Sequence, residues 1–265
     1  MSSRISETFA RLKAGGEKGL VVYLTAGDPT PAASLEYLKA AADAGADILE
    51  VGVPFSDPTA DGPTIQAASQ RALEGGMTVH RVLDLVAGFR KTHKTPIVLF
   101  GYYNPLFRYG IPALCRDARK VGVDGILVVD LPVEEWGEMA PQVREAGLDW
   151  IPLAAPTSGA ERIRRIAEAG SGFLYLISVT GITGTRTALP PEVASWTRQV
   201  RRTIRLPLAV GFGISSPQMA KGAVAHADAA IVGSACVKIV ERHGAKAEGP
   251  RELHRFVASI KKALR

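Results

Sequence analysis

One carboxylate of this 265-residue sequence stands in an otherwise apolar segment. Glu50 interrupts the run Ile-Leu-Glu-Val-Gly at positions 48–52, which has the aliphatic composition of a buried strand. A carboxylate directed into a core loses its hydration, which is costly unless the group is used or paired. Desolvation would also raise its pKa and suit it to exchange protons near neutral pH. We interpret Glu50 as catalytic; the alternative is a structural ion pair with a Lys or Arg.

The loop that follows this run carries two further carboxylates. Its sequence, GVPFSDPTADGPTIQ at positions 52–66, contains Asp57 and Asp61, and two prolines ahead of Asp61 restrict its path. Asp61 lies eleven residues beyond Glu50, which is close enough for the loop to fold back over the same site. We predict a catalytic role for Asp61. The spacing alone leaves open that both aspartates only cap a turn or the helix that follows.

Two glycine-rich segments near the end of the chain have the features of a phosphate site. GFGISSP at 211–217 and GSACVKIVE at 233–241 each follow an apolar run. Glycine lets the backbone approach a ligand closely, and the N-terminus of a following helix presents free N–H groups to an anion. Either segment alone is a weak signal, because tight turns also use glycine. Together they predict phosphate binding by Gly213, Gly233 and Ser234.

A third long loop has the composition of a lid. VTGITGTRTALPPEV at 179–193 combines two glycines, four threonines and a double proline, and such loops frequently close over substrate. Gly184 would extend the phosphate site, and Thr183 would hydrogen-bond a catalytic carboxylate; an ordinary surface loop is the alternative. Tyr175 precedes this loop within an apolar run, where a core aromatic whose hydroxyl needs a partner is expected.

These candidate residues fall at or near the ends of apolar runs that alternate with helical segments. The eight runs cover residues 20–24, 47–51, 97–101, 125–130, 149–153, 173–178, 207–211 and 229–233. Eight strand–helix units predict an α/β protein with a (β/α)8 TIM-barrel fold, whose active site lies at the carboxyl ends of the strands. An additional N-terminal helix over Ile5–Lys13 is expected to plug the opposite end. No linker divides the chain, so residues 1–265 are predicted to form a single domain.

Composition and charge argue against several other functions. The net charge is +6 and the pI is near 9.4, but the basic residues are spread over amphipathic segments, which argues against nucleic-acid binding. Cys115 and Cys236 have no paired spacing, and the five histidines lie away from the strand ends, so no disulfide or metal site is expected. No apolar stretch reaches the roughly 18 residues of a membrane span. We expect a cytoplasmic protein that uses no metal and no cofactor.

Six motifs occur in the same order as in a known family. They are GDP at 27–29, LEVGVPFSDPTADGPTIQ at 49–66, DLPVEE at 130–135, TGITG at 180–184, GFGISSP at 211–217 and GSACVKI at 233–239. This arrangement closely resembles the tryptophan synthase α-subunit family, and the resemblance runs from about residue 4 to residue 242. Tyr23, Thr59 and Val179 are mild departures from the usual pattern.

The resemblance implies a lyase that cleaves indole-3-glycerol phosphate to indole and D-glyceraldehyde 3-phosphate, in the last steps of L-tryptophan biosynthesis. At the matching positions Glu50 would move protons and Asp61 would bind the indole N–H. Tyr175 would lie beside Glu50, and Thr183 would contact Asp61. The other implied contacts are an indole slot of Tyr23, Phe100, Leu127 and Phe212, and phosphate ligands at Gly184, Gly213, Gly233 and Ser234.

The same resemblance implies a protein partner. The family's α subunit docks on a pyridoxal-phosphate-dependent β subunit in an α2β2 complex, and the matching contacts would lie at residues 54–58 and 104–107. Two alternatives remain open: a barrel that mainly activates a β partner, and another phosphate-binding TIM-barrel enzyme, such as an isomerase or indole-glycerol-phosphate synthase. The second would need a catalytic Lys or Cys at a strand end, and the sequence places none there.

Overall fold

The computed structural model describes residues 3–177 and 191–265. In this part of the chain nine parallel strands form one sheet, in the order β5-β4-β3-β2-β1-β9-β8-β7-β6. The strands are β1 (Gly19–Thr25), β2 (Ile48–Gly52), β3 (Ile97–Gly101), β4 (Gly125–Val128), β5 (Asp149–Trp150), β6 (Leu153–Ala154), β7 (Leu174–Ile177), β8 (Leu208–Gly211) and β9 (Ala229–Val232). They coincide with the eight predicted runs, except that the fifth run is split in two.

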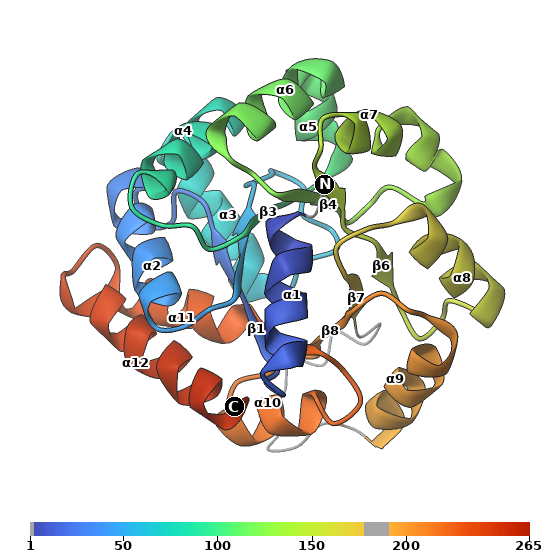
Figure 1. The fold of residues 1–265 in the computed structure, drawn as a ribbon. Coiled ribbons are helices and arrows are strands. Elements are labelled where there is room, and N and C mark those ends of the chain that lie inside the picture. The colour runs from blue at the N-terminus through green and yellow to red at the C-terminus, as the bar shows by residue number, and fades with distance from the viewer. Residues whose placement is uncertain (1–2, 178–190) are drawn as a thin grey trace.

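The sheet closes into a barrel because its two edges belong to one stretch of chain. β5 pairs with β4 and β6 pairs with β7, and only Ile151 and Pro152 separate β5 from β6. Proline has no N–H to donate, which accounts for the break in the strand. Its carbonyl still accepts a 2.8 Å hydrogen bond from the Tyr175 N–H, and the Ile151 N–H donates to the Ile126 carbonyl at 2.9 Å. The prediction of a (β/α)8 barrel is confirmed, and Figure 1 shows the helices arranged around it.

The helices follow the strands as the alternating pattern predicts. Several begin with a side-chain cap: Thr30, Thr78 and Ser216 each accept a hydrogen bond from a backbone N–H three residues later, which satisfies an otherwise free donor. None of the described helices is long and apolar enough to cross a membrane. The helices are α1 (Arg4–Ala14), α2 (Pro31–Asp43), α3 (Pro63–Glu74), α4 (Val79–Arg90), α5 (Tyr103–Tyr109), α6 (Ile111–Val121), the 3-10 helix η1 (Val133–Glu138), α7 (Ala140–Glu145), α8 (Ala160–Ala169), α9 (Pro191–Thr203), α10 (Pro217–Ala223), α11 (Ser234–His243) and α12 (Glu248–Ala263).

Alternate residues of each strand point into the barrel, as the pleat requires. In β1, Val21 and Tyr23 belong to the interior clusters, whereas Leu20 and Val22 pack in the layer between the sheet and the helices. Glu50 is the register partner of Tyr23 on the neighbouring strand β2. The alternation therefore directs Glu50 into the barrel, as predicted.

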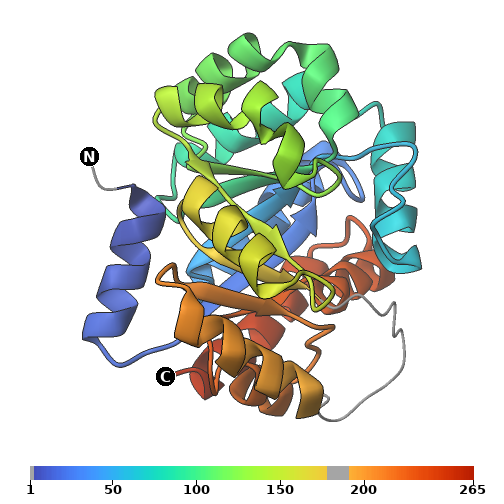
Figure 2. The same ribbon diagram turned by 90° about the vertical axis from the view of Figure 1, so that its right-hand side faces the viewer.

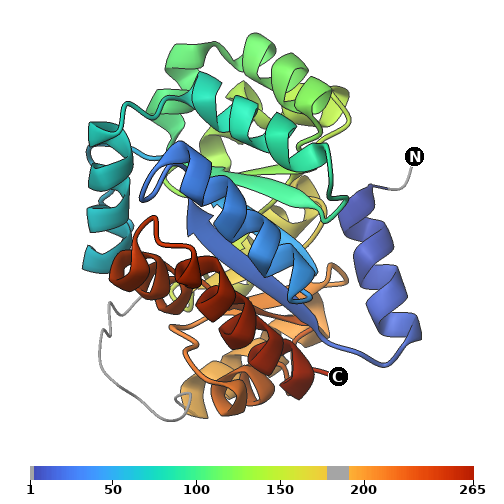
Figure 3. The ribbon, with the colours of Figure 1, turned by 90° about the vertical axis from the view of Figure 1, so that its left-hand side faces the viewer.

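The N-terminal helix α1 closes one end of the barrel. Ile5, Phe9 and Leu12 are buried and pack in the same cluster as the innermost strand residues, and the rings of Phe9 and Phe173 have centroids 5.8 Å apart. Figures 2 and 3 show α1 at one end of the molecule and α3 at the other. The predicted plug is confirmed, and the carboxyl ends of the strands are left as the accessible mouth.

Candidate active site

Glu50 lies at the centre of the barrel and has no polar partner among the described residues. Its side chain is fully buried, and neither carboxylate oxygen has a hydrogen-bond partner within residues 3–177 and 191–265. Burial raises the pKa of Glu50 to about 8. The alternative of a structural ion pair is not realised in this part of the chain, because no Lys or Arg reaches the carboxylate there. Near neutral pH the group is therefore mostly protonated and can act as a proton donor.

Asp61 is held over the mouth by its own loop and by a tyrosine. The Tyr102 hydroxyl donates a 3.0 Å hydrogen bond to Oδ2 of Asp61 and accepts one of 3.0 Å from the Ala60 N–H. The Gln66 side chain donates to the Asp61 carbonyl at 2.8 Å. Burial raises the pKa of Asp61 to about 6, although the Tyr102 hydrogen bond acts in the opposite direction. Above that pH Asp61 is mostly ionised, so the two carboxyl groups occupy different protonation states near pH 7.

Three aromatic side chains line the interior beside Glu50. The rings of Tyr23 and Phe100 meet edge to face with centroids 5.1 Å apart, and Phe100 lies 6.4 Å from Tyr175. Leu127 is fully buried in the same interior cluster and is the register partner of Phe100. The structure therefore brings together four of the residues predicted for the indole slot and its surroundings.

Two glycines make room for the tyrosine rings. A Cβ at Gly52 would clash with the Tyr23 hydroxyl, and one at Gly211 would lie 2.7 Å from the Tyr175 hydroxyl. Burial is the main cause that raises the pKa of Tyr23 and of Tyr175, and the carboxyl groups of Glu50 and Asp61 raise both further when they are ionised. Both tyrosines are therefore neutral and close to both carboxyl groups. They provide hydroxyl groups and flat apolar walls in the same compartment.

The structure places Phe212 away from this cluster. Its half-buried ring packs edge to face against Trp196 of α9, with centroids 6.3 Å apart, in the layer between sheet and helices. Because Ala209 of β8 points inward, the alternation directs a residue three positions later outward. The predicted contact of Phe212 with the indole stays a prediction that this arrangement does not support.

The predicted phosphate residues lie at the ends of two adjacent strands. β8 pairs with β9, so the loops that carry Gly213 and Gly233 start side by side. Gly213 is exposed, has φ of +65°, and has open space where a side chain would stand. Gly233 is the N-cap of α11 and Ser234 is its first residue, so the free N–H groups of the first turn point out of the helix. The other two predicted residues of this region, Thr183 and Gly184, lie outside the described residues.

Tyr102 is a site residue to which the sequence analysis gave no role. It follows β3 directly, so its position at a strand end agrees with the general location of barrel active sites. Nothing in its neighbourhood in the sequence indicates that Asp61 is its partner, because the two residues are brought together only by the fold. Within the described residues, no group of three His, Cys, Asp or Glu side chains is placed to hold a metal ion.

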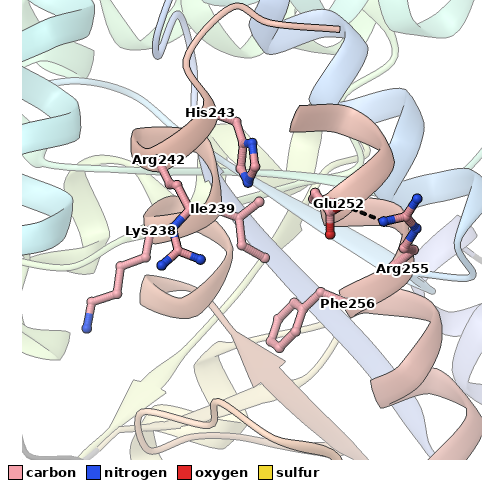
Figure 4. A pocket seen from close by; sticks show the side chains of 7 residues that line it. All are labelled: Lys238, Ile239, Arg242, His243, Glu252, Arg255 and Phe256. Carbon is pink, nitrogen blue, oxygen red and sulfur yellow. Dashed lines mark hydrogen bonds and ion pairs between the residues drawn. The ribbon is translucent and has the colours of Figure 1, made fainter. Parts of the chain in front are cut away.

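A separate cavity of about 600 Å³ lies between α11 and α12 on the outside of the barrel. Figure 4 shows Ile239 and Phe256 near its centre, and Arg255 of α12 paired with Glu252. None of its lining residues belongs to the cluster around Glu50, so this cavity is distinct from the candidate active site. It is lined by Lys238, Ile239, Arg242, His243, Glu252, Arg255 and Phe256.

The fold and the site together define a class: α/β-barrel enzymes that pair acid–base carboxyl groups with an anion-binding end at the last two strands. Comparison with known proteins gives the family. The family model described as "Tryptophan synthase alpha chain" matches residues 9–265. The chain belongs to the tryptophan synthase alpha chain family.

Individual relatives match this chain over most or all of its length. The tryptophan synthase alpha chain of Geobacter sulfurreducens is 48% identical over 262 residues, which cover 99% of each chain. The crystal structure of the alpha subunit from Legionella pneumophila superposes with a TM-score of 0.93 at 38% identity, covering 100% of this chain and 99% of the other. A structure titled as the tryptophan synthase complex of Pyrococcus furiosus matches with a TM-score of 0.83 at 38% identity, over 92% of this chain and 98% of the other.

Proposed function

We propose that the chain cleaves indole-3-glycerol phosphate to indole and D-glyceraldehyde 3-phosphate, with Glu50 and Asp61 as its catalytic residues. The observation that carries this proposal is the Glu50 carboxyl group, which is fully buried, lacks a polar partner among the described residues and has a pKa raised to about 8. Cleavage requires a proton to be given to the indole ring and another to be taken from the glycerol chain. A single carboxyl group that starts protonated can perform both transfers.

In the first step Glu50 donates its proton to C3 of the indole ring. The ring becomes an indolenine cation, with the positive charge on the ring nitrogen. The Glu50 carboxylate then takes the proton of the hydroxyl on the carbon attached to C3. The bond between that carbon and C3 breaks, its electron pair restores the aromatic ring, and the hydroxyl carbon becomes the aldehyde. Glu50 ends protonated, so atoms and electrons balance without a cofactor.

Asp61 is assigned to the developing positive charge. Its pKa is raised only to about 6, so its carboxylate is mostly ionised where Glu50 is still protonated. A positioned negative charge stabilises a cation that forms at the indole N–H more strongly than it stabilises the neutral ground state. Tyr102 supports this role because its hydrogen bond fixes the Asp61 carboxylate.

The phosphate of the substrate would be held by backbone groups. In this proposal Gly213, Gly233 and Ser234 surround it, together with Gly184, and the N-terminus of α11 supplies partial positive charge. Tyr23, Phe100, Leu127 and Tyr175 would enclose the indole ring. Thr183 would contact Asp61. Two ends of one molecule would thus be fixed, which orients the bond to be broken.

We further propose that the chain docks on a pyridoxal-phosphate-dependent tryptophan synthase β subunit in an α2β2 complex. Phe107 supports this docking. Its side chain is 57% exposed, and within the described residues no other large apolar side chain is classed as exposed. Its ring stacks on Tyr103 at 5.4 Å, so α5 presents an aromatic surface beside the mouth. The exposed loop residues Ser56 and Asp57 belong to the second expected contact.

The same proposal includes a cytoplasmic location and a single-domain chain over residues 1–265. The sequence supports both, because it contains neither a long apolar segment nor a linker. Fractionation of cells that express the chain tests the location. Limited proteolysis tests the domain organisation, because cleavage in a linker between two domains would release two fragments that each fold on their own.

The central experiment is a turnover assay with indole-3-glycerol phosphate, in which indole and glyceraldehyde 3-phosphate are both measured with and without a β subunit. We expect equimolar release of the two products by the chain alone and faster release in the complex. Activation of the β subunit without any cleavage would instead favour the barrel that only docks. Absence of both effects would contradict the proposed function altogether.

A further inference from the structure

A third carboxylate near the mouth, that of Asp28, takes no part in the proposed reaction. Asp28 belongs to the GDP motif in the loop after β1 and is only 3% exposed. Its two oxygens accept hydrogen bonds from Nε of Arg71 at 2.8 Å and from a terminal nitrogen of Arg71 at 2.9 Å. Such a two-point ion pair fixes direction as well as distance.

The same guanidinium reaches a third element. The other terminal nitrogen of Arg71 lies 3.4 Å from Oε1 of Glu241 on α11. Arg71 itself belongs to α3, so its side chain connects α3 with the loop after β1 and with α11. Ile65 and Ala68 of α3 pack with Tyr23 of β1 and Val237 of α11 in one small cluster beneath this contact.

Each connected element carries part of the candidate active site. Asp61 stands two residues before the start of α3, Tyr23 lies on β1, and α11 begins at Ser234. The relative position of α3 and α11 therefore sets the separation between the Asp61 carboxylate and the phosphate end. Reacting groups must be placed to within a fraction of an ångström, because a misplacement of about 1 Å can cost on the order of 100-fold in rate.

We propose that the Arg71–Asp28 pair is a positioning pair, which fixes α3, and with it the loop that carries Asp61, relative to the loop after β1; through its contact with Glu241, Arg71 extends this link to α11. The catalytic consequence rests on the proposed function, whereas the structural part does not. The turn that carries Asp28 is itself held in place: the Asp28 N–H donates to the Thr25 carbonyl at 3.3 Å, and the Gly27 N–H donates to Oγ of Ser34 at 3.1 Å. Asp28 is thus a fixed point from which Arg71 can orient α3.

A matched control exists at the other end of the barrel. Asp124 is also 3% exposed and pairs with Arg90 at 2.7 Å and with Arg4 at 2.8 Å, but none of these residues adjoins the candidate site. If both ion pairs serve stability alone, equivalent substitutions in either should have the same consequences. If the Arg71–Asp28 pair positions the site, only its substitutions should disturb the site.

The test compares Asp28→Asn and Arg71→Lys with the control variants Asp124→Asn and Arg90→Lys, at a temperature where circular dichroism shows all four folded. Arg71→Lys keeps the charge and loses the two-point contact, so it separates geometry from charge. Amide hydrogen exchange is measured by mass spectrometry over residues 58–66. We expect faster exchange there in the first two variants and unchanged exchange in the controls.

Kinetics with indole-3-glycerol phosphate supply the second readout. The expected loss in kcat/KM is about 10- to 100-fold for Asp28→Asn and Arg71→Lys, and less than about twofold for the controls. The proposal would be overturned if hydrogen exchange in residues 58–66 were unchanged in both Asp28→Asn and Arg71→Lys. It would also be overturned if these two variants lost no more kcat/KM than the controls. Should the wild-type chain fail to cleave the substrate, the proposed function fails, and the exchange comparison alone decides the positioning role.

Discussion

At the end of the barrel closed by α1, three aspartates each accept a hydrogen bond from a backbone N–H at the start of the neighbouring strand. Asp47 binds the Leu20 N–H at 2.9 Å, Asp124 binds the Ile97 N–H at 2.8 Å, and Asp228 binds the Leu208 N–H at 2.7 Å. Each also has a cationic partner, which is Lys261, Arg90 and Arg201 in turn. At the mouth, Glu50 and Asp61 have no such cation in residues 3–177 and 191–265.

The carboxyl groups at the two ends of the barrel differ in their surroundings, not in their chemistry. A carboxylate that accepts a backbone hydrogen bond and pairs with a cation joins neighbouring strands together, and loss of its partner would leave a charge uncompensated. A buried carboxyl group without a cation keeps its proton to higher pH and remains chemically available. One fold therefore separates carboxylates for stability from carboxyl groups for reaction, at opposite ends of its strands.

The largest effect on turnover is expected from Glu50→Gln. The substitution keeps the shape of the side chain and removes proton transfer, so kcat should fall by on the order of 10³-fold or more. Binding of a non-cleavable substrate analogue, measured by calorimetry, should stay nearly unchanged. A variant with near-wild-type turnover would remove Glu50 from the mechanism.

Asp61→Asn should have the next largest effect. Loss of a positioned charge beside a developing cation costs on the order of 3 kcal/mol, which corresponds to a fall in kcat of roughly 10²-fold. Steady-state kinetics on purified variant protein provide the measurement. A normal rate would show that Asp61 does not stabilise the transition state.

The free energy of unfolding should also depend on pH through Glu50. The pKa of Glu50 is raised from 4.5 to about 8 in the folded protein, so its contribution is complete below pH 4.5 and is lost as the pH rises toward 8. The stability of Glu50→Gln relative to the wild type should therefore increase between pH 5 and pH 8.5. We expect a gain of more than about 1.4 kcal/mol in urea unfolding, the equivalent of one pKa unit. If the free energies of unfolding of the variant and the wild type differed by the same amount at pH 5 and at pH 8.5, the raised pKa of Glu50 would be contradicted.

Tyr102→Phe should produce a smaller loss. The hydroxyl only orients Asp61 and lowers its pKa, so we expect kcat to fall by roughly 5- to 10-fold, which corresponds to the loss of one hydrogen bond of about 1 kcal/mol. The pH at which the acid limb of kcat/KM falls should move upward, since the hydrogen bond favours the ionised form. An unmoved acid limb would show that another group controls it.

Asp47→Asn should have the smallest effect on turnover. The substitution weakens a buried ion pair with Lys261 far from the mouth, so kcat/KM should stay within about twofold of the wild type. The free energy of unfolding should fall by less than the roughly 3 kcal/mol of a fully broken buried pair, because Glu17 still lies 3.4 Å from Nζ of Lys261. If turnover fell as far as in Tyr102→Phe, the two ends of the barrel would not be independent.

Much of the fold and part of the site could be predicted from the sequence, because they depend on local patterns. The apolar runs gave the strands, and the alternation of side chains along β2 directed Glu50 inward. The partners of Asp61 and Asp28 could not be predicted, because Tyr102 and Arg71 are distant in sequence and meet them only through the fold. The split of the fifth strand has a local cause, since Pro152 removes a donor.

The outward direction of Phe212 teaches a further point. Its position was predicted from resemblance, but the alternation of inward and outward residues from Ala209 leads to the opposite direction. In the structure its ring contacts Trp196, in agreement with the alternation. Whether Phe212 also contacts the indole ring stays a prediction, which substitution of Phe212 by Ala and measurement of substrate binding would test.

The helix α1 has a consequence for how the molecule is made. Ile5, Phe9 and Leu12 fill a cavity whose walls come from strands as late in the chain as Ile231 of β9. During synthesis from the N-terminus, these side chains emerge first and have no completed surface to cover them until the last strand is in place. The first helix to be synthesised can therefore bury its apolar side chains completely only after β9 has been made. Until then these side chains stay exposed and favour aggregation.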